Sequence, residues 1–241
     1  MIKIEQPDVY GWEAAIRGMR SPMKSWDKSD SGYFCGDKGC YVIEGCDLCC
    51  NIPHFVVGKN DLDLMKRLSK AGNDHGKFLR YIDVTCDITA PLYWWKEYDT
   101  YKVGTVANSC STMHKIHAKE FELDDFSHEH LDKYSLEILG RVIIALNISR
   151  EDYLENDTNK YKAMGVDRKY DWWQMIQLLP SSYNQKRTVK LNYQVLKSMY
   201  HARRNHKLDE WKDFCRWCEL LPYFKEICVE PMEKEDDKCI G

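Results

Sequence analysis

The sequence predicts a single α+β domain that is mostly helical and contains a small antiparallel sheet. The 241 residues suit one large domain, and no internal repeat or Gly-, Ser- or Pro-rich linker divides them. One segment alternates apolar and polar residues with the period of two that is typical of a strand. Most of the chain beyond residue 127 repeats its apolar residues every three or four positions, which indicates helices.

The first fifty residues are expected to be irregular, apart from a short helix from Trp12 to Met19. A clearer helix begins near residue 60, where Asn60 or Asp61 can cap the first turn and Gly72 can stop the last. Its apolar residues are expected to lie on one face.

A strand is expected to follow, because apolar residues alternate with Asp and Thr from Tyr81 onwards. The apolar positions of this strand are Ile82, Val84, Cys86 and Ile88. Pro91 ends the strand and suits the beginning of a helix that carries the aromatic run 93–95.

Helices dominate the second half of the sequence. A long amphipathic face is formed by Tyr134, Ile138, Val142, Ile143 and Leu146. Ser149 with Asp152 resembles a capping box, which is typical of a helix start. Further helices are expected over 171–179, near 188–203 and over 207–221.

The predicted organisation has three parts within one domain. Residues 1–59 form an N-terminal segment with a cysteine-rich insertion, residues 60–225 form the packed core, and residues 226–241 form a charged tail that is expected to fray.

Composition excludes several classes of protein. Lys and Arg total 35 against 38 Asp and Glu, and the resulting charge of −3 argues against a general nucleic-acid binder. No apolar run approaches the roughly 18–20 residues that span a bilayer, and no signal-peptide pattern is present. We therefore expect a soluble cytoplasmic protein with neither a membrane nor a nucleic-acid partner.

The 11 cysteines are expected to be mostly free thiols in a reducing compartment. Five of them lie between Cys35 and Cys50, where the pair Cys46-x-x-Cys49 could contribute to a zinc site. An irregular cysteine-rich insertion is the favoured interpretation there, because only one such pair is present. The pair at 215 and 218 belongs to the apolar stripe of a helix and is expected to pack in the core.

Three polar stretches hold the candidate functional residues. Residues 73–80 include His75, which could contact a ligand or simply occupy a surface turn. Residues 101–114 combine a glycine, an asparagine and small hydroxyl residues, which suit a phosphate or a nucleotide base, although the spacing of a P-loop is absent. A polar loop without a special role is the alternative.

The third stretch covers residues 179–206. Lys186, Arg187 and Lys190 form a local basic patch, and Arg203 closes a predicted helix. Arginine is suited to planar carbonyl or phosphate groups through its fixed fork of donors. A solvated helix face is the alternative interpretation.

Together these stretches resemble the flavin-dependent thymidylate synthases. Those enzymes carry a His-x-[Ser/Thr]-Pro-Phe-Glu-His turn, a strand ending in Ala-Pro and an aromatic helix. Then come Arg-His-Arg-x-x-Ser-x-Asn-x-x-Ser-x-Arg-Tyr, Leu-Pro-x-x-x-Tyr, an Asn, and an Arg eleven residues beyond it. The resembling positions here are 75–81, Ala90-Pro91, Tyr93 to Trp95, Asn108 with Ser111, Leu179-Pro180, Tyr183, Asn192 and Arg203, within residues 60–220.

The resemblance implies a homotetramer that binds FAD and dUMP at its subunit interfaces. NADPH would reduce the flavin and methylenetetrahydrofolate would supply one carbon, so that dUMP becomes dTMP. Arg203 would act in catalysis by polarising the uracil. The substrate-binding residues would be Ser111, Asn108, Lys102 and Arg187. The residues that bind the cofactor would be His75, Tyr101, Asn192 and Lys207.

The chain also departs from the family pattern. Thr100-Tyr101-Lys102, or the same run shifted by one residue, replaces Arg-His-Arg, and Gln194 replaces an arginine on the flavin side. Losing two arginines that face phosphate costs several kcal/mol at roughly 1.5–3 kcal/mol each, and Lys186 and Arg187 are hypothesised to compensate.

Two alternatives to a synthase stay open. One is a non-catalytic protein that binds or sequesters a nucleotide on the same fold, because a shared fold does not settle function. The other is a zinc-containing interaction module built around residues 35–50.

Overall fold

The computed structural model describes residues 1–34 and 54–230. Its centre is a four-stranded antiparallel sheet in the order β1-β4-β6-β5. The strands of this sheet span Lys3–Tyr10 (β1), Asp83–Pro91 (β4), Val106–Ser109 (β5) and Asn184–Asn192 (β6). A separate antiparallel pair consists of Gly32–Phe34 (β2) and His54–Val56 (β3).

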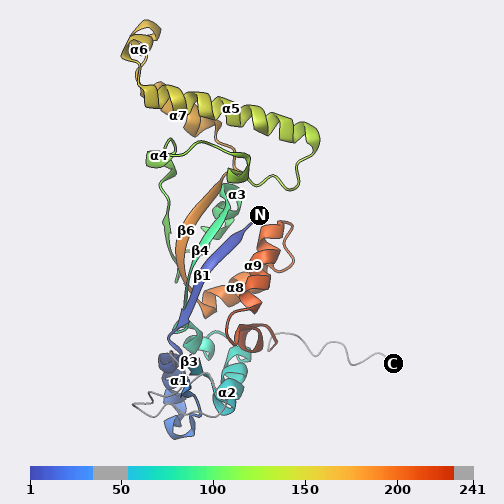
Figure 1. Ribbon diagram of the computed structural model, residues 1–241. Helices are drawn as coiled ribbons and strands as arrows, with labels where there is room; N and C mark the ends of the chain where they lie inside the picture. Colours follow the sequence, from blue (N-terminus) through green and yellow to red (C-terminus); the bar gives the residue numbers. More distant parts are fainter. Residues whose placement is uncertain (35–53, 231–241) are drawn as a thin grey trace, which may run out of the picture.

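Helices cover one face of the sheet and both of its ends (Figure 1). The α-helices are Trp12–Arg20 (α1), Lys59–Lys70 (α2), Leu92–Tyr98 (α3), Thr112–Lys115 (α4), Lys133–Glu155 (α5), Thr158–Met164 (α6), Lys169–Leu178 (α7), Tyr193–Arg203 (α8) and Asp209–Glu219 (α9). Short helical turns lie at Ser21–Met23, Trp26–Lys28, Gly76–Arg80, Leu123–Asp125 and Lys225–Val229. The predicted class, mostly helical with a small antiparallel sheet, is confirmed.

Strand β4 confirms the predicted alternation, because its apolar side chains are buried and the intervening ones are only partly covered. Strand β6 was not predicted: residues 188–192 continue a strand, and helix α8 begins only at Tyr193. The helix expected near 188–203 was therefore wrong in its first part. Val189 and Leu191 point into the core, and β6 pairs with β4 on one side and β5 on the other.

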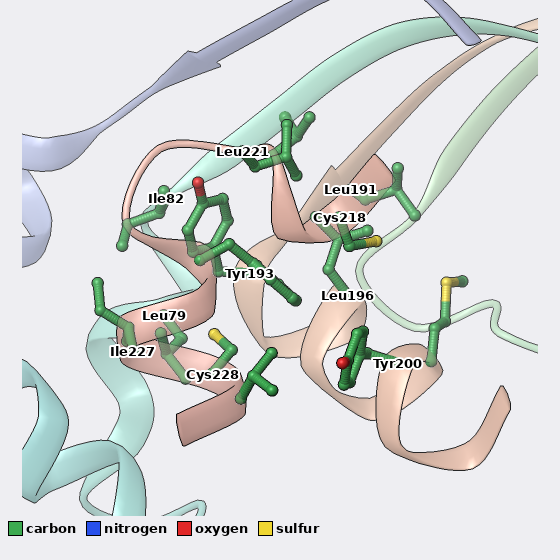
Figure 2. Packing of buried hydrophobic residues seen from close by; sticks show 14 of the residues in the cluster. Leu79, Ile82, Leu191, Tyr193, Leu196, Tyr200, Cys218, Leu221, Ile227 and Cys228 are labelled. Atoms are coloured by element: carbon green, nitrogen blue, oxygen red, sulfur yellow. The ribbon is translucent and has the colours of Figure 1, made fainter. Parts of the chain in front are cut away.

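The main core lies between the sheet and helices α8 and α9 (Figure 2). Tyr193, Leu196 and Tyr200 of α8 lie in one buried cluster with Cys218 of α9. The residues of α9 that face the core are Trp211, Phe214, Cys215 and Cys218. The predicted packing of Cys215 and Cys218 in the apolar stripe of this helix is thus confirmed.

The packed core continues beyond residue 225, because Ile227, Cys228 and Val229 are buried against it. The tail from residue 231 onwards lies outside the described residues, as does the cysteine-rich stretch from Cys35 to Cys50. The fraying of that tail and the zinc interpretation of that stretch therefore stay predictions.

A second, smaller core forms between α5 and α7, which cross the end of the sheet farthest from α1 and α2 (Figure 1). Leu139, Leu146 and Met175 are buried there. The predicted apolar face of α5 is only partly buried, because Tyr134 is 72% exposed and Ile138 is 45% exposed. Within the described chain, α7 is the main helix packed on α5, and this leaves part of the apolar face uncovered.

Two predicted helix starts were wrong. Gly58 is the N-cap residue of α2, Asn60 and Asp61 lie inside its first turn, and the Asp30 carboxylate accepts hydrogen bonds from both of their amides. Helix α5 is capped by Asp132, whose carboxylate accepts a hydrogen bond from the Ser135 amide. The expected capping box at residues 149–152 lies inside α5, because apolar packing against α7 carries the helix through it.

The N-terminal segment is more regular than expected, since β1 forms an edge strand of the sheet. Its pairing with β4 shifts register between Glu5 and Asp8, and Gln6 has a φ of 50°. This bulge interrupts the alternation that would have marked a strand. In the part of the chain that the structure describes, no helix has the length and apolarity needed to cross a bilayer.

Candidate functional site

A cleft of about 500 Å³ opens where the loop after α3 meets the first turns of α8. It is lined by Asn73, Arg80, Thr100, Tyr101, Lys102, Val103, Gly104, Asn192, Gln194, Val195 and Ser198. The cleft brings together three of the predicted site residues, Tyr101, Lys102 and Asn192. They come from segments about ninety residues apart in the sequence, which the antiparallel pairing of β5 with β6 brings side by side.

Asn192 holds the floor of this cleft. It is the last residue of β6, and its side-chain oxygen accepts a hydrogen bond from the Val195 amide at 3.0 Å, which caps α8. Its Nδ2 atom faces Gly104, where an added Cβ would come within 3.0 Å of it. Gly104 also has a φ of +79°, so glycine is needed here both for space and for backbone conformation.

The polar groups of the cleft include an acceptor without a partner. Gln194 donates through Nε2 to Asn73 Oδ1 at 3.2 Å. Its Oε1 atom is buried and makes no hydrogen bond within the described residues. A buried unpaired amide oxygen is costly unless a ligand or water donates to it, so this atom is suited to an N–H group of a bound molecule.

The cleft is positively charged. Arg80 and Lys102 are both exposed at its rim, and neither forms an ion pair with another described residue. Since these cations are not neutralised by carboxylates, they suit the phosphates of a nucleotide. Arg80 lies in the stretch 73–80 that was singled out from the sequence, but no pattern there distinguishes it from His75.

Arg203 lies beside the cleft rather than in its lining. It is the last residue of α8, and its Nε atom donates to the Tyr101 hydroxyl at 3.0 Å. Its Nη1 atom donates to Glu97 Oε2 at 2.8 Å, and the guanidinium lies 5.0 Å from the centre of the Trp211 ring. Tyr101 therefore connects Arg203 to the cleft, because it both lines the cleft and binds the guanidinium.

Arg187 is held in a similar way, also near the C-terminal end of α3. Its guanidinium stacks on the Trp95 ring at 4.1 Å, while Nη1 donates to Asp99 at 2.7 Å and Nε donates to Gln185 at 2.9 Å. Its side chain is 15% exposed. In the pairing of β5 with β6, Arg187 lies directly opposite Ser109.

The predicted nucleotide-binding residues Asn108 and Ser111 flank this arginine. Asn108 is exposed on β5 opposite Thr188, and Ser111 caps the short helix α4 by accepting from the His114 amide at 3.2 Å. The structure thus places Asn108, Ser111 and Arg187 at the β5–β6 pair, but Asn108, which pairs with Thr188, lies on the face of the sheet opposite Arg187. They line none of the cleft that contains Lys102.

The remaining two predicted site residues are both exposed. His75 precedes the turn Gly76–Arg80, close in sequence to Asn73 of the cleft. Lys207 lies between α8 and α9 and lines none of the cleft.

The predicted basic patch is neutralised within the chain. Lys186 lies 3.0 Å from Asp87, and Lys190 lies 2.8 Å from Asp83. A hydrogen bond to Asp87 raises the pKa of Lys186 above its ordinary value. Successive side chains of a strand point to opposite faces, so Lys186 lies on the face of the sheet opposite Arg187. The two cannot compensate jointly at one site of the same chain.

Sequence reasoning missed Glu97, which binds both Arg203 and the indole N–H of Trp211, each at 2.8 Å. No local pattern marks a single acidic residue in the last turn of α3. Its role becomes visible only when α3, α8 and α9 are packed together.

Comparisons with known proteins support the fold. No protein-family model matches the chain, and no curated protein sequence matches it. A structure of thymidylate synthase X (ThyX) from Helicobacter pylori with FAD and dUMP is 16% identical, with a TM-score of 0.59, over 97% of this chain and 100% of that one. A flavin-dependent ThyX from the same organism, complexed with FAD and dUMP, is 17% identical, with a TM-score of 0.59, over 95% and 98%. The chain has the fold of these synthases.

Proposed function

We propose that the chain is a diverged flavin-dependent thymidylate synthase that methylates dUMP to dTMP with FAD, NADPH and methylenetetrahydrofolate. The observation that carries this proposal is the placement of α8. Its cap, Asn192, contacts the cleft loop at Gly104, and its last residue, Arg203, binds Tyr101 of the same loop. One helix of 11 residues thus joins an amide-lined cleft to an arginine suited to a pyrimidine carbonyl.

The cleft residues fit part of a flavin nucleotide. The unpaired Oε1 of Gln194 can accept from a ring N–H, and Arg80 can bind phosphate oxygens. We infer that Asn192 and Tyr101 border the same ligand and that His75 lies near it. Lys207 would contact that ligand from a neighbouring copy of the chain. FAD, when bound, would supply the hydride that reduces the transferred one-carbon group.

The chain's own residues would then position dUMP. Arg203 can donate to a pyrimidine carbonyl and polarise it, because its guanidinium is fixed before the substrate arrives. Ser111 and Arg187 form the second polar group, and we propose that it binds the nucleotide in an adjacent subunit. Asn108 lies on the opposite face of the same strand pair and would not contact the same ligand from the same chain. Lys102 would bind the phosphate at the rim of the cleft.

This division of residues between two places supports a homotetramer with composite sites. Helix α5 leaves apolar side chains uncovered, including Ile144 at 61% exposure and Ile148 at 56%. An exposed apolar stripe of this kind marks an interaction surface. We also propose a cytoplasmic location, because the cysteines that the structure describes are all free thiols.

A second candidate function is a nucleotide-binding protein without catalysis. It is favoured by the two ion pairs Arg203–Glu97 and Arg187–Asp99. Both arginines that are expected to bind the substrate already form an ion pair with a carboxylate of the same chain. Such a protein would bind the nucleotide and leave it unchanged.

The test begins with a visible absorption spectrum of the protein after incubation with FAD and desalting, with and without dUMP. A retained flavin band that shifts with dUMP, followed by NADPH oxidation and dTMP formation, is the expected result. Nucleotide binding without dTMP formation would favour the second candidate. Failure to retain FAD and to bind dUMP would contradict both.

A further inference from the structure

Three N–H groups converge on one oxygen of Glu97. Oε2 of this carboxylate lies 2.8 Å from Arg203 Nη1, 2.8 Å from Trp211 Nε1 and 3.4 Å from His206 Nε2. The donors come from α8, from α9 and from the segment between them, whereas Glu97 lies on α3. Glu97 is thus fixed by three segments, and its side chain is only one-third exposed.

This arrangement changes what Arg203 can bind. Its Nε and Nη1 atoms are engaged by Tyr101 and Glu97, while Nη2 has no partner among the described residues. The guanidinium keeps free N–H donors, but its positive charge is offset by a carboxylate at 2.8 Å. A donor without net charge suits a neutral carbonyl oxygen, whereas an anion placed on it would also meet the negative charge of Glu97.

We propose that Glu97 is a positioning residue through which Arg203 selects a neutral planar carbonyl and rejects anions. The inference rests on the proposed function, because the carbonyl would be that of a pyrimidine ring. It adds a determinant of specificity that the motif positions do not contain.

The charges in the cleft complement this selection. Arg80 and Lys102 lack carboxylate partners among the described residues, so phosphate is favoured there. Tyr101 lies between the two environments, since it lines the cleft and binds Arg203. A nucleotide bound across Tyr101 would place its ring toward Arg203 and its phosphate toward Lys102.

The test compares Glu97→Gln with the unaltered full chain by isothermal titration, using inorganic pyrophosphate and deoxyuridine as separate probes. Glutamine keeps the size of the side chain and an acceptor oxygen but removes the negative charge. We expect pyrophosphate to bind Glu97→Gln about tenfold more tightly, with deoxyuridine affinity changed less than threefold. Glu97→Asp, which keeps the charge, should retain the original preference.

Two further variants exclude other causes. Asp213→Asn removes one carboxylate from an exposed pair with Arg216, so it controls for the general change in charge and should leave pyrophosphate binding unchanged. In the double variant Glu97→Gln with Arg203→Gln, the gain should disappear. If Gln is not tolerated at position 97, Glu97→Ala, which also unpairs Arg203, must show the same gain.

Two results would overturn the inference: unchanged pyrophosphate affinity in a folded Glu97→Gln protein, or an equal gain in Asp213→Asn. The pyrophosphate measurement needs no nucleotide, so it tests the effect of Glu97 separately from the proposed function. An unaltered chain that binds neither deoxyuridine nor dUMP would instead contradict the proposed function.

Discussion

Arg20 and Asp61 form a buried ion pair in which Arg20 Nε lies 2.6 Å from Asp61 Oδ1, and neither side chain is more than 5% exposed. The second oxygen of Asp61 accepts hydrogen bonds from the hydroxyls of Ser29 and Ser31 at 2.7 and 2.6 Å. This carboxylate therefore ties α1, α2 and the segment before β2 together. Burial alone would raise its pKa, but the hydrogen bonds from Ser31, Ser29 and Arg20 outweigh that effect and lower it.

Asp61→Asn should reduce the free energy of unfolding by about 3–5 kcal/mol, because it leaves the buried Arg20 charge unpaired. Since the pKa of Asp61 is lowered on folding, its contribution is fully present above the unfolded value of about 4 and is lost as the pH falls through the folded pKa. Urea unfolding between pH 3 and 7 measures both effects. Asp63→Asn, at an exposed position of the same helix, is the control and should change stability little.

Arg80→Ala should weaken the retention of FAD by about tenfold, since a charge-assisted hydrogen bond contributes roughly 1.5–3 kcal/mol. Fluorescence titration of the flavin measures the dissociation constant. Lys162→Ala removes another exposed cation, from α6, and should leave the constant unchanged. An equal loss in that control would mean that only the net charge matters.

Arg203→Lys should lower kcat for dTMP formation by at least about a hundredfold, while FAD retention stays within threefold. Lysine keeps the charge, but it cannot bind Tyr101 and Glu97 through two atoms of one rigid fork. Loss of a positioned donor in a transition state is worth roughly 2.7–4 kcal/mol. Steady-state kinetics separates the two parameters, and a change confined to KM would contradict a catalytic role.

Cys110 should react with iodoacetamide in the native protein well before Cys86, Cys215, Cys218 and Cys228. Cys110 is exposed, whereas the other four thiols are buried. Burial raises the pKa of Cys86, Cys215 and Cys228 to about 12, so they hold almost no reactive thiolate near neutral pH. Peptide mass spectrometry after timed labelling, with a denatured sample as reference, gives each rate.

Ile144→Glu should shift the protein toward smaller species in sedimentation velocity, if α5 forms part of a subunit interface. A charge on this exposed apolar stripe must be desolvated when two copies meet. Lys162→Glu changes an exposed charge on α6 and serves as the matched control. An unaltered chain that sediments as a monomer would contradict the proposed tetramer itself.

Elements whose signal is local were predictable. Strand β4 and helix α9 each bury one face, so the period of their apolar residues marks them in the sequence. The strands β1 and β6 were missed for different reasons. The bulge at Gln6 breaks the alternation of β1, whereas the strand identity of 188–192 depends on pairing with two neighbours.

The same distinction holds for the candidate site. Tyr101, Asn192 and Arg203 could be selected from their order along the chain. The fold brings all three together at the loop that follows α3. Glu97 could not be found in this way, because it lies 106 positions from Arg203 and meets it only after α3 packs against α8. The pairing of Arg187 with Asp99 has the same origin.

The separate small core beneath α5 has a kinetic consequence. Because Leu139, Leu146 and Met175 pack apart from the main cluster, the amide hydrogens of α5 and α7 can exchange with solvent through openings that leave the sheet intact. Their protection would then rise with protein concentration wherever a second copy covers the helix, while the protection of β4 and β6 would not. The protection of α5 and α7 would then depend more on contact with a second copy of the chain than on their own small core.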